Sequence, residues 1–151
     1  MNEILLLHGP NLNALGRRDP GIYPRITLAE LEQQVTAWAA ERGWRLRAFQ
    51  SNCEGALIDE LQRAVAWAVG ALVNLGALTH TSYALHDALL DFQRPVIEVH
   101  LSRISQREPW RRVSVIRPVC RGYVEGRGVD GYRRALEMLA VAVNEESEAG
   151  R

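Results

Sequence analysis

The chain has 151 residues, of which 47% are hydrophobic and 24% charged, proportions typical of one soluble globular domain. Its 18 basic and 18 acidic residues balance, so charge gives no reason to expect a nucleic acid or a membrane surface as a partner. All 18 basic residues are arginine, and the absence of lysine excludes Schiff-base catalysis, pyridoxal phosphate attachment, a Walker A loop and a receiver domain.

The N-terminal part of the chain predicts a strand followed by a helix. Residues 4 to 7 form a short, continuous apolar run that ends before His8, which is typical of a buried strand. Thr27 and Glu30 form a capping box ahead of apolar residues at helical spacing, and Gly43 is a natural C-terminal stop. No basic segment followed by an apolar one opens the chain, so we expect no signal peptide and a cytoplasmic location.

The middle of the chain predicts two strands around a helix. Trp44 to Gln50 alternates like a strand, Glu54 to Val69 has the spacing of a helix, and Ala71 to Leu75 is apolar enough for a buried strand. The most apolar stretch, Ala64 to Leu78, is interrupted by glycine and asparagine. It is also too short to span a membrane, which takes roughly 20 apolar residues.

The second half of the chain continues this alternation. Its expected elements are a helix at Ser82 to Phe92, a strand at Val96 to Leu101, a strand within Val113 to Glu125 and a helix at Val129 to Val143. We expect residues 1–143 to form a single catalytic domain, and we expect the polar tail 144–151 to be frayed.

Strands that alternate with helices imply βαβ units and a parallel sheet. We therefore predict an α/β fold, namely a flavodoxin-like three-layer α/β/α sandwich with a five-stranded parallel sheet. Ligands of such folds bind outside the carboxyl ends of the strands. Polar clusters follow four predicted strands, at His8 to Asn11, Gln50 to Asn52, Asn74 to Ser82 and Glu98 to Ser102. The site is therefore expected at that edge of the sheet.

Glu98 and His100 form the first candidate for catalysis. They stand at positions i and i+2 of a predicted strand, and hence on one face of the sheet. A carboxylate beside an imidazole fixes the tautomer of the ring and raises its pKa, which suits a general acid. Taken alone, the pair is equally typical of a structural histidine with a carboxylate partner, and this alternative stays open.

The segment from Leu15 to Tyr23 is a loop rich in glycine and proline that holds Arg17, Arg18 and the tyrosine. Its functional interpretation is a lid, in which a neighbouring cation favours the phenolate form of Tyr23. The alternative is a solvated loop with an exposed aromatic residue.

Three further groups could bind an anion or a polyol. Thr79 to Ser82 enters a helix, Arg107 to Arg112 offers guanidinium groups for a carboxylate, and Asp87 could accept hydrogen bonds from hydroxyls. Each also has a structural interpretation, respectively a helix cap, a surface ion-pair cluster and a solvated carboxylate.

The four histidines are scattered and Cys53 and Cys120 lie far apart in the sequence. We therefore expect no metal site and, in the cytosol, no disulfide.

Taken together, these segments resemble the type II 3-dehydroquinate dehydratase family. The matching motifs occur in family order and span nearly the whole chain. They are Gly9-Pro-Asn-Leu-Asn13, Leu15-Gly-Arg-Arg-Asp-Pro-x-x-Tyr23, Gln50-Ser-Asn-x-Glu-Gly55, Asn74-x-Gly-Ala-x-Thr-His-Thr-Ser82, Ala84-Leu-x-Asp-Ala-Leu89, Val96-Ile-Glu-Val-His-x-Ser102, Arg107-Glu-Pro-x-Arg111 and Gly131-Tyr132.

The resemblance implies an anti elimination of water from 3-dehydroquinate through an enolate, without a metal, a cofactor or a Schiff base. It implies that Tyr23, as a phenolate, removes the C2 proton. It also implies that Arg18 lowers the pKa of this tyrosine and stabilises the transition state. Asn11 would hold a water against the enolate oxygen, and His100, oriented by Glu98, would protonate the departing C1 hydroxyl.

The resemblance also implies a set of substrate ligands and an assembly. The ligands are Asn74, His80 and Asp87 for the hydroxyls, the amides of Leu101 and Ser102 with Arg111 for the carboxylate, and Arg107 as a lid arginine. Members of the family form trimers that assemble into dodecamers, so we expect a homododecamer. The product would serve the shikimate route to aromatic amino acids, or the enzyme would serve quinate catabolism.

The sequence departs from the family pattern at positions without a chemical role. They are Asp19 for glutamate, Pro24 for glycine, Cys53 and Ala56 for histidine and glutamate, His86 for arginine, and Arg117 and Arg127 for small or apolar residues. Asp19 and Pro24 are expected to change the kinetics of the lid, and the other departures are expected to change contacts between subunits.

Two other functions are alternatives to a dehydratase. A flavodoxin-like module that binds a flavin or a nucleotide needs a hydroxyl-rich phosphate loop after the first strand, which Gly9 to Ala14 does not supply. A catalytically dead paralogue with a structural role is disfavoured because Tyr23, Arg18, Asn11 and His100 are all present.

Overall fold

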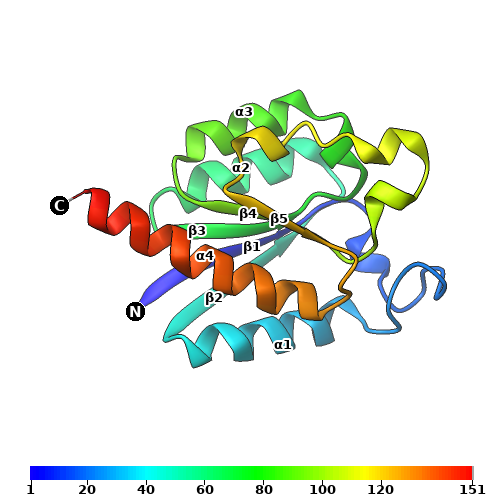
Figure 1. Ribbon diagram of the computed structural model, residues 1–151, viewed down its shortest axis with the longest axis horizontal. Coiled ribbons are helices and arrows are strands. Elements are labelled where there is room, and N and C mark those ends of the chain that lie inside the picture. The colour runs from blue at the N-terminus through cyan, green and yellow to red at the C-terminus, as the bar shows by residue number, and fades with distance from the viewer. Residues whose placement is uncertain (151) are drawn as a thin grey trace.

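The computed structural model describes residues 1–150 and contains a five-stranded parallel sheet (Figure 1). Its strands are β1 (Asn2–His8), β2 (Trp44–Gln50), β3 (Ala68–Asn74), β4 (Val96–His100) and β5 (Gly122–Glu125). Their order across the sheet is β2-β1-β3-β4-β5, and every neighbouring pair is parallel. This is the flavodoxin-like order, and it confirms the fold predicted from the sequence.

Helices cover both faces of the sheet, which gives three layers (Figure 1). The helices are α1 (Leu28–Glu41) and α4 (Asp130–Ala149) on one face, and α2 (Glu54–Ala64) and α3 (Tyr83–Phe92) on the other. Ile4 and Leu6 of β1 pack in the core under α1 and α4, whereas Leu5 and Leu7 pack in the core under α2 and α3. All four side chains are fully buried, which explains why this strand is a continuous apolar run rather than an alternating one.

The predicted caps fix the starts of two helices. The Glu30 amide donates to the Thr27 hydroxyl at 3.2 Å at the start of α1, and Gly43, with φ of +75°, follows its end. The Leu85 amide donates to the Ser82 hydroxyl at 3.0 Å at the start of α3. The capping signals in the sequence were therefore interpreted correctly.

The boundary between α2 and β3 was predicted wrongly. The sequence predicted a helix as far as Val69, whereas α2 ends at Ala64 and β3 begins at Ala68. The intervening residues, 65–67, are all apolar, so the spacing of apolar residues alone does not separate a helix from a buried strand here. The pairing of Ala68 with Glu3 of β1 decides in favour of the strand.

Helix α4 continues to Ala149, whereas the sequence predicted its end at Val143. Arg121 contacts the added turns, pairing with Glu145 at 2.5 Å and with Glu146 at 3.3 Å.

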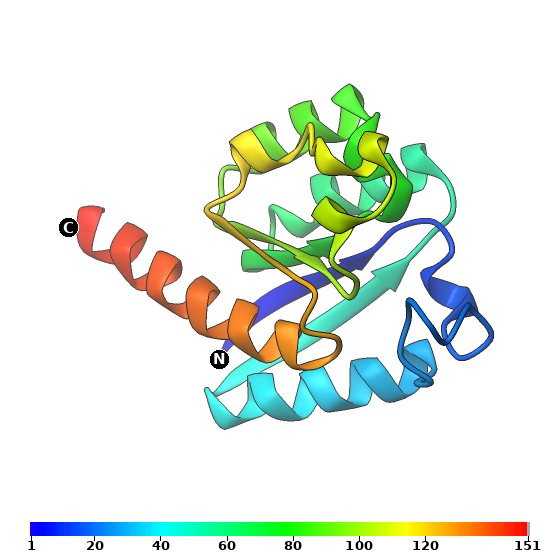
Figure 2. The same ribbon diagram turned by 45° about the vertical axis from the view of Figure 1, so that its right-hand side comes forward.

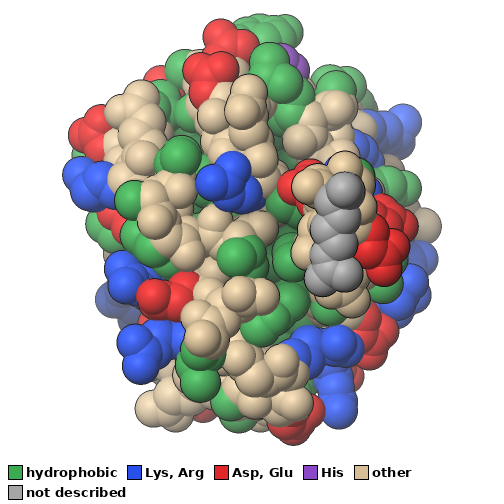
Figure 3. Space-filling model, turned by 90° about the vertical axis from the view of Figure 1, so that its left-hand side faces the viewer, with side chains coloured by type: hydrophobic (Ala, Val, Ile, Leu, Met, Phe, Trp, Pro, Cys, Tyr) green, Lys and Arg blue, Asp and Glu red, His purple; other side chains and the backbone are tan. Residues whose placement is uncertain are grey.

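Figure 3 looks onto this end of the molecule, where acidic and basic side chains are interspersed and form no large patch of one sign. Among the described residues, no helix is both long and apolar enough to cross a bilayer.

The carboxyl ends of β1, β3 and β4 meet at one edge of the sheet, as predicted. The loop of residues 9–27, between β1 and α1, lies over this edge together with the irregular segment 101–121, between β4 and β5 (Figure 2). Short 3-10 helices rather than long regular elements build both segments. The edge is therefore covered by chain whose conformation depends on local turns.

Candidate active site

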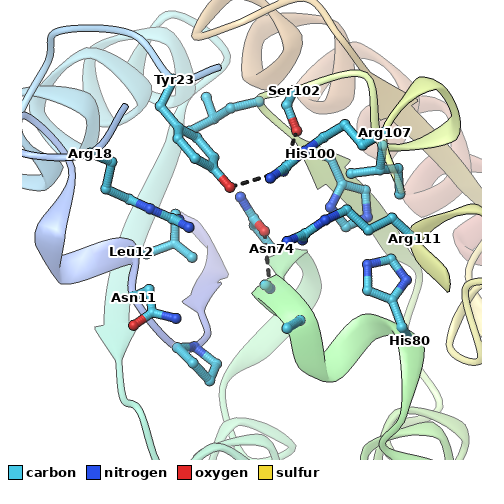
Figure 4. A pocket seen from close by; sticks show the side chains of 15 residues that line it. Asn11, Leu12, Arg18, Tyr23, Asn74, His80, His100, Ser102, Arg107 and Arg111 are labelled. Atoms are coloured by element: carbon cyan, nitrogen blue, oxygen red, sulfur yellow. Dashed lines mark hydrogen bonds between the residues drawn. The ribbon is translucent and has the colours of Figure 1, made fainter. Parts of the chain in front are cut away.

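A cavity opens at this edge of the sheet, between the loop after β1 and the segment after β4 (Figure 4). It encloses about 550 Å³ of space, including its open mouth. Ten residues singled out in the sequence line it, namely Asn11, Arg18, Tyr23, Asn74, His80, His100, Leu101, Ser102, Arg107 and Arg111. The two remaining candidates, Glu98 and Asp87, do not line it.

Glu98 lies directly behind the cavity and holds the His100 ring. The carboxylate is fully buried in β4, and its Oε2 lies 2.5 Å from His100 Nε2. Burial by itself would raise the pKa of Glu98, but the hydrogen bonds and charges of His100 and Arg117 outweigh burial and lower it. Because an ionised carboxylate only accepts, the Nε2 atom carries the proton of this bond. The Nδ1 atom is then the ring nitrogen available to a ligand.

Arg117 is a second partner of Glu98, and the sequence did not reveal it. Its Nε donates to Glu98 Oε1 at 3.1 Å and its Nη2 to Oε2 at 3.3 Å. The residue belongs to a 3-10 helix ahead of β5 and does not line the cavity. The buried carboxylate thus bridges one cation outside the cavity and the imidazole inside it.

Tyr23 presents its hydroxyl to the cavity with an arginine on each side. Arg107 Nη1 donates to the phenol oxygen at 2.9 Å, and it also donates to the Ser102 hydroxyl at 3.2 Å (Figure 4). The Arg18 guanidinium carbon lies 3.8 Å from the centre of the Tyr23 ring. The sequence assigned the cation beside the tyrosine to Arg18, whereas here Arg107 bonds the oxygen and Arg18 stacks on the ring.

Asp19 shapes the turn that presents Tyr23. Its Oδ1 accepts the Gly21 amide at 2.9 Å, and its carbonyl accepts the Tyr23 amide at 2.9 Å. A side-chain acceptor two residues before the donor is the Asx turn, which the short side chains of Asp and Asn favour. The aspartate at this position therefore has a local structural role in the loop.

Asn11 is held in a left-handed conformation, with φ of 72°. Its amide donates to Asn52 Oδ1 at 3.0 Å, and Gln50 Nε2 donates both to that same oxygen and to the Gly9 carbonyl, each at 3.1 Å. Left-handed backbone is unusual for residues other than glycine and needs surrounding contacts. The Gln50-Ser-Asn52 motif after β2 supplies those contacts.

Two glycines let the loop after β1 approach the loop after β3. A Cβ atom on Gly9 would lie 2.4 Å from the Leu75 carbonyl oxygen, and one on Gly76 would lie 2.8 Å from the Pro10 carbonyl oxygen. Gly76 also has φ of +57°, a conformation that favours glycine. The close approach places Asn11 on the same cavity wall as residues that follow β3.

Asn74 ends β3 and is fixed from two sides. Its Nδ2 donates to the Tyr132 hydroxyl at 3.3 Å, and its Oδ1 accepts the Gly76 amide at 3.2 Å. Burial raises the pKa of Tyr132 to about 12, so this phenol stays neutral. Tyr132, from α4, therefore anchors a cavity residue, a role that its motif in the sequence did not disclose.

His80 and Arg111 form the far wall of the cavity. His80 Nδ1 lies 2.6 Å from the Val113 carbonyl, so Nδ1 carries a proton and Nε2 is the free acceptor. Burial is the main cause that lowers the pKa of His80. A neutral ring with a free Nε2 suits the acceptance of a ligand hydroxyl. Arg111 pairs with Glu108. Arg107 and Arg111 both line the cavity.

Asp87 lies outside the cavity of its own chain. Its side chain is 76% exposed on α3 and contacts His86 Nδ1 at 3.1 Å. Ser82 at the start of this helix caps it and also donates to Glu54 Oε2 at 2.5 Å, so its hydroxyl has a structural role. The helix-cap interpretation of this segment therefore holds, and within one chain Asp87 is a solvated carboxylate. Among the described residues, no cluster of histidine, cysteine or acidic side chains could hold a metal ion.

The chain is similar to known proteins over most of its length. The profile of the family described as Dehydroquinase class II matches residues 2–140. A 3-dehydroquinate dehydratase of Anoxybacillus flavithermus is 54% identical over 92% of this chain and 94% of its own length. A catabolic 3-dehydroquinase of Aspergillus terreus is 47% identical over 97% of both chains. The crystal structure of the type II dehydroquinase of Butyrivibrio crossotus superposes with a TM-score of 0.89 at 40% identity, covering 92% of this chain and 97% of that one.

Proposed function

The chain belongs to the class II dehydroquinase family, and from that premise we propose that it removes water from 3-dehydroquinate to give 3-dehydroshikimate. The observation that carries the proposal is the shared cavity of Tyr23 and His100, one a candidate base and the other a candidate acid. Three arginines line the same cavity and suit an anionic substrate. The reaction is an elimination in two stages, with an enolate between them.

In the first stage, Tyr23 acts as a phenolate and takes the proton from C2 of the substrate. Arg107 donates to the phenol oxygen and Arg18 stacks on the ring, so two fixed charges lie beside the oxygen that must become negative. A charge-assisted hydrogen bond to an anion is stronger than one to a neutral hydroxyl. Both arginines therefore support the base, although only Arg107 reaches its oxygen directly.

The enolate oxygen then needs a hydrogen-bond donor at a fixed position. Asn11 holds a water against that oxygen, in the manner of an oxyanion hole. The contacts of Asn52 and Gln50 fix the backbone of Asn11 before substrate arrives. A donor that is positioned in advance needs little reorganisation when the charge develops.

In the second stage, His100 acts as an imidazolium and protonates the departing C1 hydroxyl. Glu98 occupies Nε2, so the proton leaves from Nδ1. The leaving hydroxyl and the added proton form the water that is released. Before the next turnover Tyr23 must lose the proton that it took from C2, and His100 must take up one to become an imidazolium again, so the cycle has no net change in protons.

The remaining cavity residues bind the substrate. The amides of Leu101 and Ser102, together with Arg111, hold the ring carboxylate, and Arg107 closes over it. Asn74 and the free Nε2 of His80 bind hydroxyls. Asn74 is fixed by Tyr132 and Gly76, so its side chain keeps one orientation.

Asp87 can fill its role as a hydroxyl ligand only in the cavity of a neighbouring copy, because it does not line its own and its side chain is largely exposed. Tyr83 and Leu90 share this helix face at i−4 and i+3 and are 72% and 56% exposed. An exposed apolar face of this kind suits subunit contact. The resemblance to the family implies a homododecamer, which this exposed face supports as far as subunit contact, and we include it in the proposal. We also propose a cytoplasmic location.

The physiological direction is either biosynthetic or catabolic. Among the relatives, one is named simply as a dehydratase and another as a catabolic enzyme. Both use the same elimination, so the cavity serves the shikimate route or quinate breakdown equally well.

The test is a turnover assay with purified protein and 3-dehydroquinate. We expect an ultraviolet band from the conjugated product 3-dehydroshikimate, and we expect sodium borohydride to leave the rate unchanged because the chain has no lysine for a Schiff base. A protein that forms no product, or that is purified with a yellow flavin chromophore, would overturn the proposal.

A further inference from the structure

Arg117 holds the carboxylate that holds the proposed acid. We propose that Arg117 is a positioning residue that sets the acid strength of His100 through Glu98. The inference rests on the proposed function for its effect on turnover, and on geometry alone for its effect on the histidine.

The carboxylate of Glu98 is shared between two partners, and both contact its Oε2 atom. Arg117 contacts both of its oxygens, at 3.1 and 3.3 Å, while His100 Nε2 contacts one of them at 2.5 Å. Glu98 is fully buried and His100 is 4% exposed, so water screens these charges poorly. The charge of Arg117 therefore acts on the imidazole through one shared group.

Arg117 itself is held in place. Its guanidinium carbon lies 3.7 Å from the centre of the Tyr123 ring, and its amide donates to the Ser114 hydroxyl at 3.1 Å. Only 31% of its side chain is exposed. A guanidinium that stacks on a ring and grips both oxygens of a carboxylate keeps its geometry better than a solvated surface ion pair does.

The direction of the effect follows from Coulomb's law. A buried carboxylate alone stabilises the imidazolium form of His100 and makes it a weak acid. The positive charge of Arg117 offsets part of that stabilisation, so the imidazolium releases its proton more readily. Compared with a variant that lacks this charge, Arg117 therefore favours proton transfer from the imidazolium to the leaving hydroxyl.

Other charged and titratable groups also face His100. They are His80, Arg111 and Arg107 on the segments after β3 and β4, Arg18 and Tyr23 on the loop after β1, and Glu125 beside it in β5. Glu125 bonds the Ser105 hydroxyl and amide at 2.5 and 3.2 Å, and the arginines keep their charge at all relevant pH values. None of these groups has a hydrogen bond to Glu98. Cys120 lies within range of the charges of Glu98 and Arg117, but burial above all raises the pKa of its thiol to about 12, so it stays neutral.

The experiment compares Arg117→Ser with the wild-type protein by two readings. The first is the titration of His100 by NMR of protein with labelled histidine, assigned with His100→Ala. The second is the dependence of kcat on pH, in which activity falls where His100 loses its proton. We expect both midpoints to move up by about one pH unit in Arg117→Ser, and we expect kcat on the plateau to fall about threefold.

Two further variants separate charge from packing. Arg117→Gln keeps hydrogen-bond donors and loses the charge, so it should show the same upward shift. Arg117→Lys keeps the charge but loses the contact with both oxygens and the stacking, so its shift should be smaller than that of Arg117→Gln. Arg121→Ser is the matched control, because within residues 1–150 the Arg121 side chain pairs with the exposed Glu145 and Glu146, and its loss should shift neither curve. If Arg117→Ser does not fold, Arg117→Gln carries the comparison.

Unchanged midpoints in Arg117→Ser and Arg117→Gln, with only a lower unfolding temperature, would reduce Arg117 to a structural residue and overturn the inference. If the wild-type protein lacked dehydratase activity, the proposed function would fail. The NMR titration would then still decide whether Arg117 acts on His100.

Discussion

The cavity is built from two kinds of structure that differ in how firmly they are held. Its sheet side carries His100 and Asn74 at the ends of β4 and β3, with Glu98 behind His100; the three residues are 4%, 5% and 0% exposed. Its loop side carries Tyr23 and Arg18 on a segment that local turns and the Arg107 bond hold in place. The proposed acid is thus positioned by the fold as a whole, and the proposed base by a few contacts that a substrate can rearrange.

The largest effect should come from the loop side. Tyr23→Phe removes the only proposed base, so kcat should fall to background, by at least about 10⁴-fold, while a substrate analogue still binds. Steady-state kinetics together with calorimetric binding of the analogue check this. Substantial turnover in Tyr23→Phe would show that another group takes the C2 proton.

The matching change on the sheet side should be milder. His100→Ala should lower kcat by about 10²- to 10⁴-fold, because water can replace a general acid in part. The unfolding temperature should also fall, because the variant leaves the buried Glu98 with only Arg117 as a hydrogen-bond partner. A rate close to that of the wild type would remove His100 from the mechanism.

A smaller effect is expected from a change at Asn52, which supports the backbone of Asn11. Asn52→Ala deletes the acceptor of the Asn11 amide, so the left-handed backbone of Asn11 loses its main support. We expect kcat to fall about tenfold and the free energy of unfolding to fall by about 1 kcal/mol. Rates at saturating substrate and urea denaturation measure the two. A loss of stability without a loss of rate would show that Asn11 needs no such support.

The smallest effect should come from the turn that presents the base. Asp19→Ala removes the Asx turn but leaves the backbone bond from Tyr23, so kcat/KM should fall about threefold. Asp19→Asn keeps a side-chain acceptor and should retain wild-type kinetics. If both variants lost activity equally, the charge of Asp19 rather than its turn would be the important property.

The sheet side of the site was also the more predictable one. Apolar runs identified β1 and β3, and the polar residues near the carboxyl ends of the strands had to meet at one edge because the strands are parallel. The strand β5 was harder to bound, because Gly122–Glu125 is a short edge strand in which Tyr123 is 49% exposed. An edge strand without an apolar run gives no periodic signal.

The contacts that support the site could not be predicted from the sequence. Arg117 lies 19 residues from Glu98, and Tyr132 lies 58 residues from Asn74. Each pairing depends on the register of strands and on where α4 packs, which local sequence patterns do not specify. Arg107 shows the same limit on the loop side, because only the folded chain places it on the Tyr23 oxygen across 84 residues.

The permanent cations of the cavity are guanidinium groups, from Arg18, Arg107 and Arg111, and this has a practical consequence. A guanidinium stays protonated up to about pH 12, whereas an ammonium group begins to lose its charge about two units lower. The attraction that these three groups exert on an anionic inhibitor should therefore be the same in mildly acidic and in alkaline buffer. The protons that calorimetry detects when such an inhibitor binds would report on the imidazoles, the phenol and the inhibitor itself, undisturbed by the groups that attract it.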